Sequence, residues 1–334
     1  MESSDLYLDS GYLNMGAVID DPHFMRVVVS ARGPGKTFGA LSQAVIKGLT
    51  FLYLRRTKTQ LDICSNPLYS PFKRINAFYG WDVQPKKGSG LAVFQDGEHI
   101  VGYAGALSTF RNVRGFDGSD INLIIWDEFI PEEEERVTFN DWTAFLNVVE
   151  TVARNREQEG RGPVRILLCA NANKIYGYAV NGLGIENDLM DMRDTGEELR
   201  EISPDLLLVV PRAEKFTEEK RLTALYRLTA GSRFSEMAID NRFRIRSKDR
   251  IGRRPLAEFV PLCGFKGEFV YRHKADRSYY VTSVKRGSPV VFEDTPDGKA
   301  KFLKKFGFLD LAHTRGRVWF ESLHDQAGFF EMIR

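Results

Sequence analysis

The stretch Ser30–Thr37, SARGPGKT, has the residue types of a loop that binds phosphate groups. Gly33 and Gly35 allow a tight backbone path that Cβ atoms would obstruct. Backbone N–H groups of such a loop, and the helix N-terminus after it, point at phosphate oxygens. Lys36 then reaches the β- and γ-phosphates, and the Thr37 hydroxyl is a magnesium ligand. We expect nucleotide binding by Ser30, Ala31, Arg32, Gly33, Pro34, Gly35, Lys36 and Thr37.

The segments around this loop have the order strand, loop, helix. RVVVS (26–30) is a β-branched run typical of a buried parallel strand. KTFGALSQAVIKG (36–48) has apolar residues at helical spacing and a glycine that ends the helix. This context favours a phosphate loop over a chance glycine turn. Ser30 takes the first position, where the usual pattern has glycine, at a point where a small side chain is tolerated.

A second apolar run, INLIIW (121–126), is followed by two adjacent carboxylates, Asp127 and Glu128. In open α/β sheets, ligands bind at the carboxyl ends of the strands. Asp127 would hold magnesium there, directly or through water, and Glu128 would polarise the attacking water. The second carboxylate favours an ATPase over a GTPase switch, and the sequence has no NKxD-like tetrapeptide that reads guanine. The alternative is a solvated acidic strand end.

Polar residues also end two other predicted strands. Asn171 follows VRILLCA (164–170), where it would sense the γ-phosphate or position the water, or would be an ordinary strand-end residue. Arg55 and Arg56 end FLYLRR (51–56). A predicted helix, NDWTAFLNVVETVARNRE (140–157), has one apolar face and runs into Arg154 and Arg156. Such arginines either reach a neighbouring subunit's γ-phosphate or are solvated cations at a helix C-terminus.

Composition limits the class of protein. The 334 residues are 43% hydrophobic and 28% charged with a net charge of +2, so any nucleic-acid contact would have to come from local patches. Three scattered cysteines and five spread histidines match neither a disulfide framework nor a metal site. The sequence has neither a signal-peptide pattern nor an apolar run of about 20 residues. We expect a cytosolic protein with no membrane segment.

The pattern of elements predicts an α/β protein of three parts. Alternating strands and helices predict a P-loop ATPase domain over 1–210, with a mostly parallel sheet covered on both faces. Residues 211–254 have the pattern of a linker or lid subdomain. Within it, residues 240–254 carry seven basic residues against two acidic ones, which indicates either a DNA- or subunit-facing strip or a solvated linker. Residues 255–334 have the pattern of a small α+β domain.

Five segments, SARGPGKT, FLYLRRTK, LIIWDEFI, ETVARNRE and CANAN, occur in an order and spacing similar to the DNA-packaging motor ATPases of small podophages, the phi-twenty-nine-like group. The resemblance extends through about the first 245 residues. It implies an ASCE-type ATPase that uses ATP and Mg²⁺ to pump double-stranded DNA into a procapsid. It also implies a homo-oligomeric ring of five subunits docked on the portal, in the host cytoplasm, with a structural RNA as a further candidate partner.

The resemblance also implies roles for single residues. Arg154 matches the family's arginine finger, which acts in trans; Arg156 lies on the same edge, and Arg114 matches a basic residue working between subunits. Lys58 matches a lysine that faces DNA in the pore. Arg55 and Arg56, just before Lys58, are further predicted DNA contacts, one of which could pair with acidic groups inside the fold instead.

By resemblance, the C-terminal domain would be RNase H-like and related to the nuclease of large terminases. The central positions of its strands EFVYR and YYVTSV are not acidic, and Asp276, Asp297, Asp310 and Asp325 have the pattern of turn or edge residues. A two-metal nuclease needs converging carboxylates, so we expect no nuclease activity. Two rival functions remain: a helicase- or recombinase-type ATPase that does not act at a portal, and a non-hydrolysing scaffold, which would not need Glu128.

Overall fold

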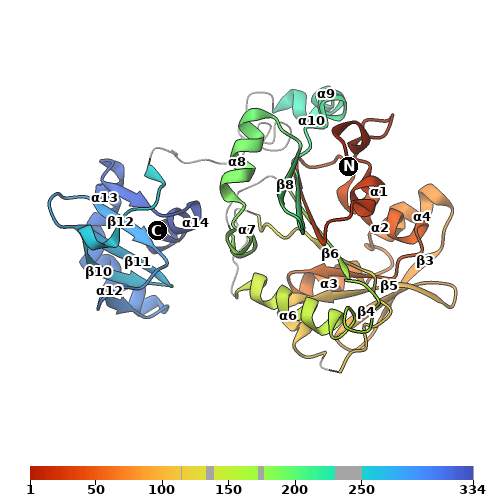
Figure 1. Ribbon diagram of the computed structural model, residues 1–334, viewed down its shortest axis with the longest axis horizontal. Coiled ribbons are helices and arrows are strands. Elements are labelled where there is room, and N and C mark those ends of the chain that lie inside the picture. Colours follow the sequence, from red (N-terminus) through yellow and green to blue (C-terminus); the bar gives the residue numbers. More distant parts are fainter. Residues whose placement is uncertain (114, 133–138, 172–176, 230–249, 334) are drawn as a thin grey trace. The chain divides into compact units, whose positions relative to one another are not determined.

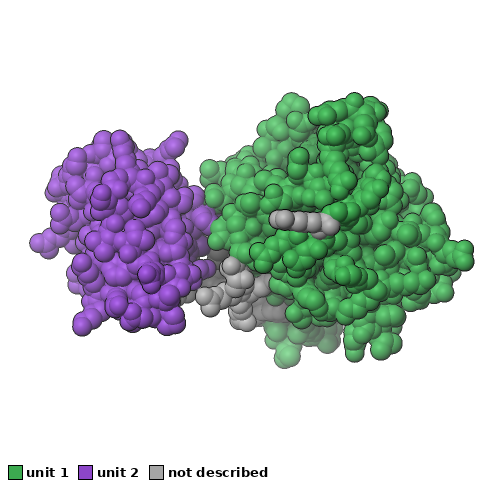
Figure 2. Space-filling model, turned by 90° about the horizontal axis from the view of Figure 1, so that it is seen from below, with its two compact units in different colours: residues 1–244 green, residues 245–334 purple. Residues whose placement is uncertain are grey.

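The computed structural model describes residues 1–113, 115–132, 139–171, 177–229 and 250–333. The chain divides into two units, residues 1–244 and 245–334, which Figure 2 colours green and purple. Within the described ranges, every helix is too short or too polar to span a lipid bilayer.

A nine-stranded sheet organises the first unit (Figure 1). Its strand order is β3-β4-β5-β2-β6-β7-β1-β9-β8. The strands are β1 (Met25–Ser30), β2 (Phe51–Arg55), β3 (Val83–Lys87), β4 (Leu91–Asp96), β5 (His99–Ala106), β6 (Leu123–Asp127), β7 (Arg165–Asn171), β8 (Leu199–Ser203) and β9 (Leu206–Val209). The run from β5 to β9 is parallel, and antiparallel pairs occur at the two edges. The predicted mostly parallel sheet is confirmed.

Helices cover both faces of this sheet. They are η1 (Ser3–Leu6), α1 (Met15–Asp20), α2 (Lys36–Ile46), α3 (Lys58–Cys64), α4 (Phe72–Tyr79), α5 (Leu107–Phe110), α6 (Asp141–Ala153), α7 (Tyr178–Leu183), α8 (Glu186–Thr195), α9 (Glu214–Arg221) and α10 (Ala224–Leu228). Because side chains alternate along a strand, Ile125 and Trp126 face opposite ways. Ile125 belongs to the core cluster of α1, α2 and α4. Trp126 stacks on Phe145 of α6, with ring centroids 4.9 Å apart.

Local sequence explains the elements nearest the candidate site. All six residues of β1 are buried, as the β-branched run predicts. The strand predicted over 121–126 is β6, which begins two residues later and includes Asp127 as its last residue. Pairing with β7 extends to Asp127 and Cys169, so the carboxylate is held by the sheet and not by a loop. A hairpin joins β4 to β5, with Gly97 at φ 60° in its turn.

The second unit contains a separate mixed sheet, in the order β13-β10-β11-β12-β14. Its elements are η3 (Leu256–Glu258), β10 (Phe259–Phe265), β11 (Glu268–His273), β12 (Tyr279–Thr282), β13 (Val290–Phe292), α12 (Pro296–Phe306), α13 (Phe308–Thr314), β14 (Val318–Phe320) and α14 (Leu323–Ile333). Strand β11 pairs antiparallel with β10 and with β12. At the edges, β13 pairs in parallel with β10, and β14 pairs in parallel with β12. Aromatic residues dominate the core, including Phe265, Phe302 and Phe320.

The acidic residues of the second unit do not all lie where the sequence indicated. Asp297 and Asp310 are exposed in the first turns of α12 and α13, and Asp276 is exposed in the turn before β12. Asp325 is different, because it is only 3% exposed in the first turn of α14. The turn-or-edge prediction is wrong for Asp325, since its carboxylate faces inward and accepts hydrogen bonds from Ser322.

Candidate nucleotide site

The P-loop joins β1 to α2 and depends on two glycines. Gly33 has φ 107° and Gly35 has φ 97°, backbone angles that residues other than glycine rarely adopt. Gly35 is also the N-cap of α2, so the helix N-terminus begins directly at the loop. Arg32 and Gly33 are exposed, whereas Ser30 and Lys36 are buried. The loop therefore presents its backbone to solvent at the N-terminus of an 11-residue helix, where an anion is favoured.

Lys36 is held by groups of the loop itself and by a neighbouring strand. Its Nζ donates to Ser30 Oγ at 2.8 Å, to the Ala31 carbonyl at 2.9 Å and to Asn171 Oδ1 at 3.2 Å. Burial lowers the pKa of Lys36 to about 8. Asn171 ends β7 directly beside Ser30 in the register. The serine that replaces the usual glycine thus supplies an acceptor for Lys36, and the predicted strand-end Asn171 lies at the same lysine.

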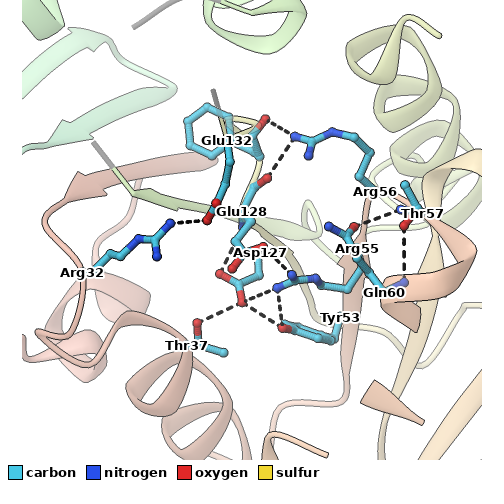
Figure 3. Close-up of polar contacts among 11 residues, drawn as sticks. Arg32, Thr37, Tyr53, Arg55, Arg56, Thr57, Gln60, Asp127, Glu128 and Glu132 are labelled. Atoms are coloured by element: carbon cyan, nitrogen blue, oxygen red, sulfur yellow. Dashed lines mark hydrogen bonds and ion pairs between the residues drawn. The ribbon is translucent and has the colours of Figure 1, made fainter. Parts of the chain in front are cut away.

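Asp127 accepts hydrogen bonds from side chains of two other elements, α2 and β2 (Figure 3). Thr37 Oγ1 donates to Asp127 Oδ2 at 2.9 Å, and the buried Tyr53 hydroxyl donates to the same oxygen at 2.8 Å. In the part of the chain that the structure describes, no group of three or more His, Cys, Asp or Glu side chains lies close enough together to hold a metal ion. One hydroxyl and one carboxylate suit Mg²⁺ nonetheless, because this ion is commonly bound by one or two carboxylates together with substrate phosphates and water.

Glu128 has a strained backbone and an arginine partner. Its φ of 55° lies in the left-handed region, which is uncommon for a glutamate and typical of functional sites. The Glu128 carboxylate pairs with Arg55 Nη2, and Arg55 Nη1 lies 3.1 Å from Asp127 Oδ2 (Figure 3). Arg55 therefore bridges both carboxylates in this structure. The sequence left open that one of Arg55 and Arg56 pairs with acidic groups inside the fold, and in the structure both do.

Arg56 is also inside the fold, with 2% exposure. Its Nε donates to Asp141 Oδ2 at 2.8 Å, and its Nη2 donates to the carbonyls of Glu128 and Phe129 at 3.0 and 2.9 Å. Arg56 thus fastens the segment after β6 to the start of α6. A guanidinium buried in this way offers no surface to DNA, which differs from the contact predicted for Arg56. Arg55, paired with Asp127 and Glu128, differs in the same respect.

Lys58 is the exposed residue among the three predicted DNA contacts. It opens α3 three residues after β2 ends, and its side chain is 64% exposed. Lys58 Nζ lies 2.9 Å from Asp62 Oδ2, and Lys87 Nζ, at the end of β3, lies 2.9 Å from the other oxygen. Lys87 was not among the residues predicted from the sequence. Its only signal was the KKGSG run before β4, which resembles any polar turn.

The predicted inter-subunit arginines occupy different environments. Arg154 caps α6 at φ 41° and is exposed; its Nη2 donates to the Phe116 carbonyl at 2.9 Å. Arg156 is 9% exposed and donates to the carbonyls of Ile121 and Gly162, at 2.6 and 3.0 Å. Arg156 is therefore occupied within its own chain. Arg114 lies outside the described residues.

A phosphate loop between β1 and α2, with two carboxylates at the end of β6 in the same sheet, defines a P-loop nucleotide-binding protein. The chain belongs to the Podovirus DNA encapsidation protein (Gp16) family, whose model matches residues 8–262. This membership confirms the resemblance found in the sequence.

Individual relatives agree with this family. The DNA packaging protein of Bacillus phage phi29 is 27% identical over 240 residues, which cover 70% of this chain and 66% of the relative. The chain thus spans about two thirds of the length of that curated relative. A structure of the phi29 viral genome packaging motor assembly has a TM-score of 0.60 at 20% identity, covering 97% of this chain and 99% of that one. The N-terminal domain of the phi29 DNA packaging ATPase has a TM-score of 0.50 at 23% identity, covering 61% and 98%. At these identities the structures establish a shared fold.

Proposed function

We propose that this chain hydrolyses ATP to move double-stranded viral DNA into a procapsid, as one subunit of a ring docked on the portal. The observation that carries the proposal is the meeting of Thr37, Asp127 and Glu128 at the P-loop of a DNA encapsidation family member. The description of a phi29 relative as part of a viral genome packaging motor assembly supports the motor role. A ring of five subunits and a structural RNA remain part of the proposal through resemblance alone.

The proposed chemistry divides among residues already positioned. Thr37 and Asp127 would hold Mg²⁺, which when bound neutralises phosphate charge and orients the phosphate oxygens. Lys36 would exchange its present acceptors for phosphate oxygens, with Asn171 close enough to sense the exchange. Glu128 would orient the attacking water after Arg55 releases its carboxylate.

Two further proposed contacts, one with a neighbouring subunit and one with DNA, would couple ATP hydrolysis to DNA movement. Arg154 is exposed at the end of α6, as an arginine acting on a neighbouring subunit's γ-phosphate must be. Lys58 and Lys87 form an exposed pair of lysines around Asp62, suited to the DNA backbone. Residues 55 to 58 link Arg55 at the carboxylates to Lys58 at the surface, so DNA contact and the state of Glu128 share one short segment.

The finer fold assignments belong to this proposal. β7 lies between β1 and β6, which supports an ASCE-type core with an additional strand. The second unit combines an antiparallel meander with flanking helices, which supports an RNase H-like domain. The absence of nuclease activity stays a prediction. The boundaries proposed from sequence, 1–210, 211–254 and 255–334, stay predictions.

The test compares Glu128→Gln and Lys36→Ala with wild type. Glu128→Gln should bind ATP with Mg²⁺ but hydrolyse it slower by a factor on the order of 10² to 10⁴, since phosphate contacts persist and the orienting base is lost. Lys36→Ala should lose binding. Procapsids with portal should make the wild-type protein protect added double-stranded DNA from nuclease. Strand separation without procapsids would favour the helicase alternative, and near-normal turnover by Glu128→Gln would remove Glu128 from its role.

A further inference from the structure

Helix α9 packs directly on the P-loop, although the two are far apart in sequence. The side chain of Phe216 lies over Gly33 so closely that a Cβ on this glycine would be 2.7 Å from the ring. Lys220, one turn further along α9, donates from Nζ to the carbonyl of Arg32. The Lys220 Nζ lies 3.7 Å from the position of that same Gly33 Cβ. A second lysine is therefore placed at the exposed part of the phosphate loop.

An aromatic residue from the N-terminal segment completes this contact. Tyr12 lies 3.3 Å from the position that a Cβ on Gly35 would take, and its ring centroid is 5.2 Å from that of Phe216. The neighbouring Leu13 N–H donates to the Pro34 carbonyl at 3.0 Å, which fixes the segment to the loop. Tyr12 and Phe216 thus cover the two glycines, and α9 lies beside the N-terminal segment in Figure 1.

Aromatic rings and the neighbouring Arg32 surround the ammonium group of Lys220. Its Nζ lies 5.7 Å from the ring centre of Phe216 and 4.9 Å from that of Tyr226. Burial, and then the nearby Arg32, lower the pKa of Lys220 to about 8. Lys220 in turn contributes to the lowered pKa of Lys36. Positive charges that repel one another at a phosphate loop are stabilised when a polyanion binds among them.

We propose that Lys220 is a second phosphate-binding lysine, which contacts the bound nucleotide in the same subunit as Lys36, while Phe216 packs α9 against Gly33 of the loop. The inference rests on the proposed ATP binding at the P-loop. It adds α9 to the nucleotide site, on the evidence of Phe216 and Lys220 at the loop.

The test is a comparison of two lysines on the same helix. Lys220→Met removes the charge and keeps an unbranched side chain that is one atom shorter. Lys215→Met is the matched control, because Lys215 is exposed and donates to the Asp9 carbonyl at 2.6 Å, away from the P-loop. Titration of the full chain with fluorescent ATP and Mg²⁺ should give a Kd raised about tenfold or more for Lys220→Met. Lys215→Met should bind within about twofold of wild type, and Lys220→Arg should restore most of the affinity.

The outcomes separate this inference from the proposed function. Wild-type protein that fails to bind ATP overturns both. Binding that is lost in Lys36→Ala but unchanged in Lys220→Met overturns the role of Lys220 alone. Melting temperatures without nucleotide detect a structural role. A packing role for Lys220 would lower the melting temperature of Lys220→Met and Lys220→Gln. It would also leave Lys220→Arg with the same weakened ATP binding as those two variants. This combined result would overturn the proposal.

Discussion

At the scale of single residues, the hydroxyl of Ser30 would compete with the phosphates of the proposed nucleotide for Lys36. It accepts from the lysine at 2.8 Å in a fully buried position. We expect Ser30→Ala to bind ATP roughly 2–10 times more tightly, since one hydrogen bond of about 1 kcal/mol no longer holds Lys36 back. Equilibrium titration with ATP and Mg²⁺ measures this. Weaker binding by Ser30→Ala would mean instead that the hydroxyl positions Lys36 for the phosphates.

Arg55 is the second residue whose partner sets the state of the site. Its pairing with Glu128 occupies the carboxylate that should orient water. We expect Arg55→Met to raise ATP hydrolysis without DNA severalfold and to bring the ratio of rates with and without DNA close to one. Arg55→Lys keeps the charge but loses the planar guanidinium group. Its rate of hydrolysis without DNA should therefore lie between the rates of the wild type and Arg55→Met. Steady-state rates against DNA concentration test this, and hydrolysis abolished in Arg55→Met would assign Arg55 to the reaction itself.

The sequence predicted residues whose role is local and missed those whose role depends on distant partners. Gly33, Gly35, Lys36 and Thr37 follow from one short pattern in one loop. Lys220 meets Arg32 across 188 positions of sequence, and no local pattern marks such a contact.

At the scale of elements, the buried pair of Arg56 and Asp141 joins β2 to α6. Both side chains are 2% exposed, and Nε lies 2.8 Å from Oδ2. We expect Asp141→Asn to destabilise the first unit by about 3 kcal/mol, because the buried guanidinium group of Arg56 loses its ion pair with Asp141. Urea unfolding followed by tryptophan fluorescence measures the loss. The double variant Arg56→Met with Asp141→Leu should recover much of the lost stability. An unchanged free energy of unfolding in Asp141→Asn would show that the carbonyls of Glu128 and Phe129 suffice for Arg56.

The helices and strands themselves were largely predictable from the sequence, whereas the order of the strands in the sheet and the packing of helices on it were not. Periodicity identified β1, α2, β2, β6, α6 and β7, because buried strands and amphipathic helices carry their signal in a few consecutive residues. Sheet order carries no such signal. The position of β7 between β1 and β6 brings Asn171 beside Ser30, and it depends on pairing between strands about 140 residues apart. The same holds for Asp325, whose burial depends on α14 packing against β11.

At the scale of the whole molecule, the two units should respond differently to pH. In the second unit, Glu268 is 4% exposed at the start of β11, and Gly328 of α14 packs against its side chain. Burial, and then the neighbouring Asp325, raise the pKa of Glu268 from 4.5 to about 9. Glu331 adds to this shift, and His324 Nε2 lies 3.6 Å from Glu268 Oε1. The carboxyl group is therefore protonated in the folded unit at neutral pH.

This shift has a definite sign for stability. Between about pH 4.5 and about pH 9 the unfolded chain releases the Glu268 proton and the folded unit keeps it. The folded state then binds more protons, so the contribution of Glu268 to stability falls as pH rises through this window. Glu268→Gln keeps the shape and removes the titration. We expect amide exchange in β11 and α14 of the full chain to be slowed roughly tenfold or more by Glu268→Gln at pH 8, and much less at pH 5.

The control for this prediction is Glu293→Gln, an exposed glutamate of the same unit. It should leave exchange in β11 and α14 unchanged at both pH values. Exchange in the first unit should not respond to Glu268→Gln, because the acid pair lies wholly within residues 245–334. Equal protection of β11 in wild type and Glu268→Gln at pH 8 would mean that the folded unit accommodates an ionised Glu268. Faster exchange in the variant would instead make the carboxyl group a stabilising hydrogen-bond partner of α14.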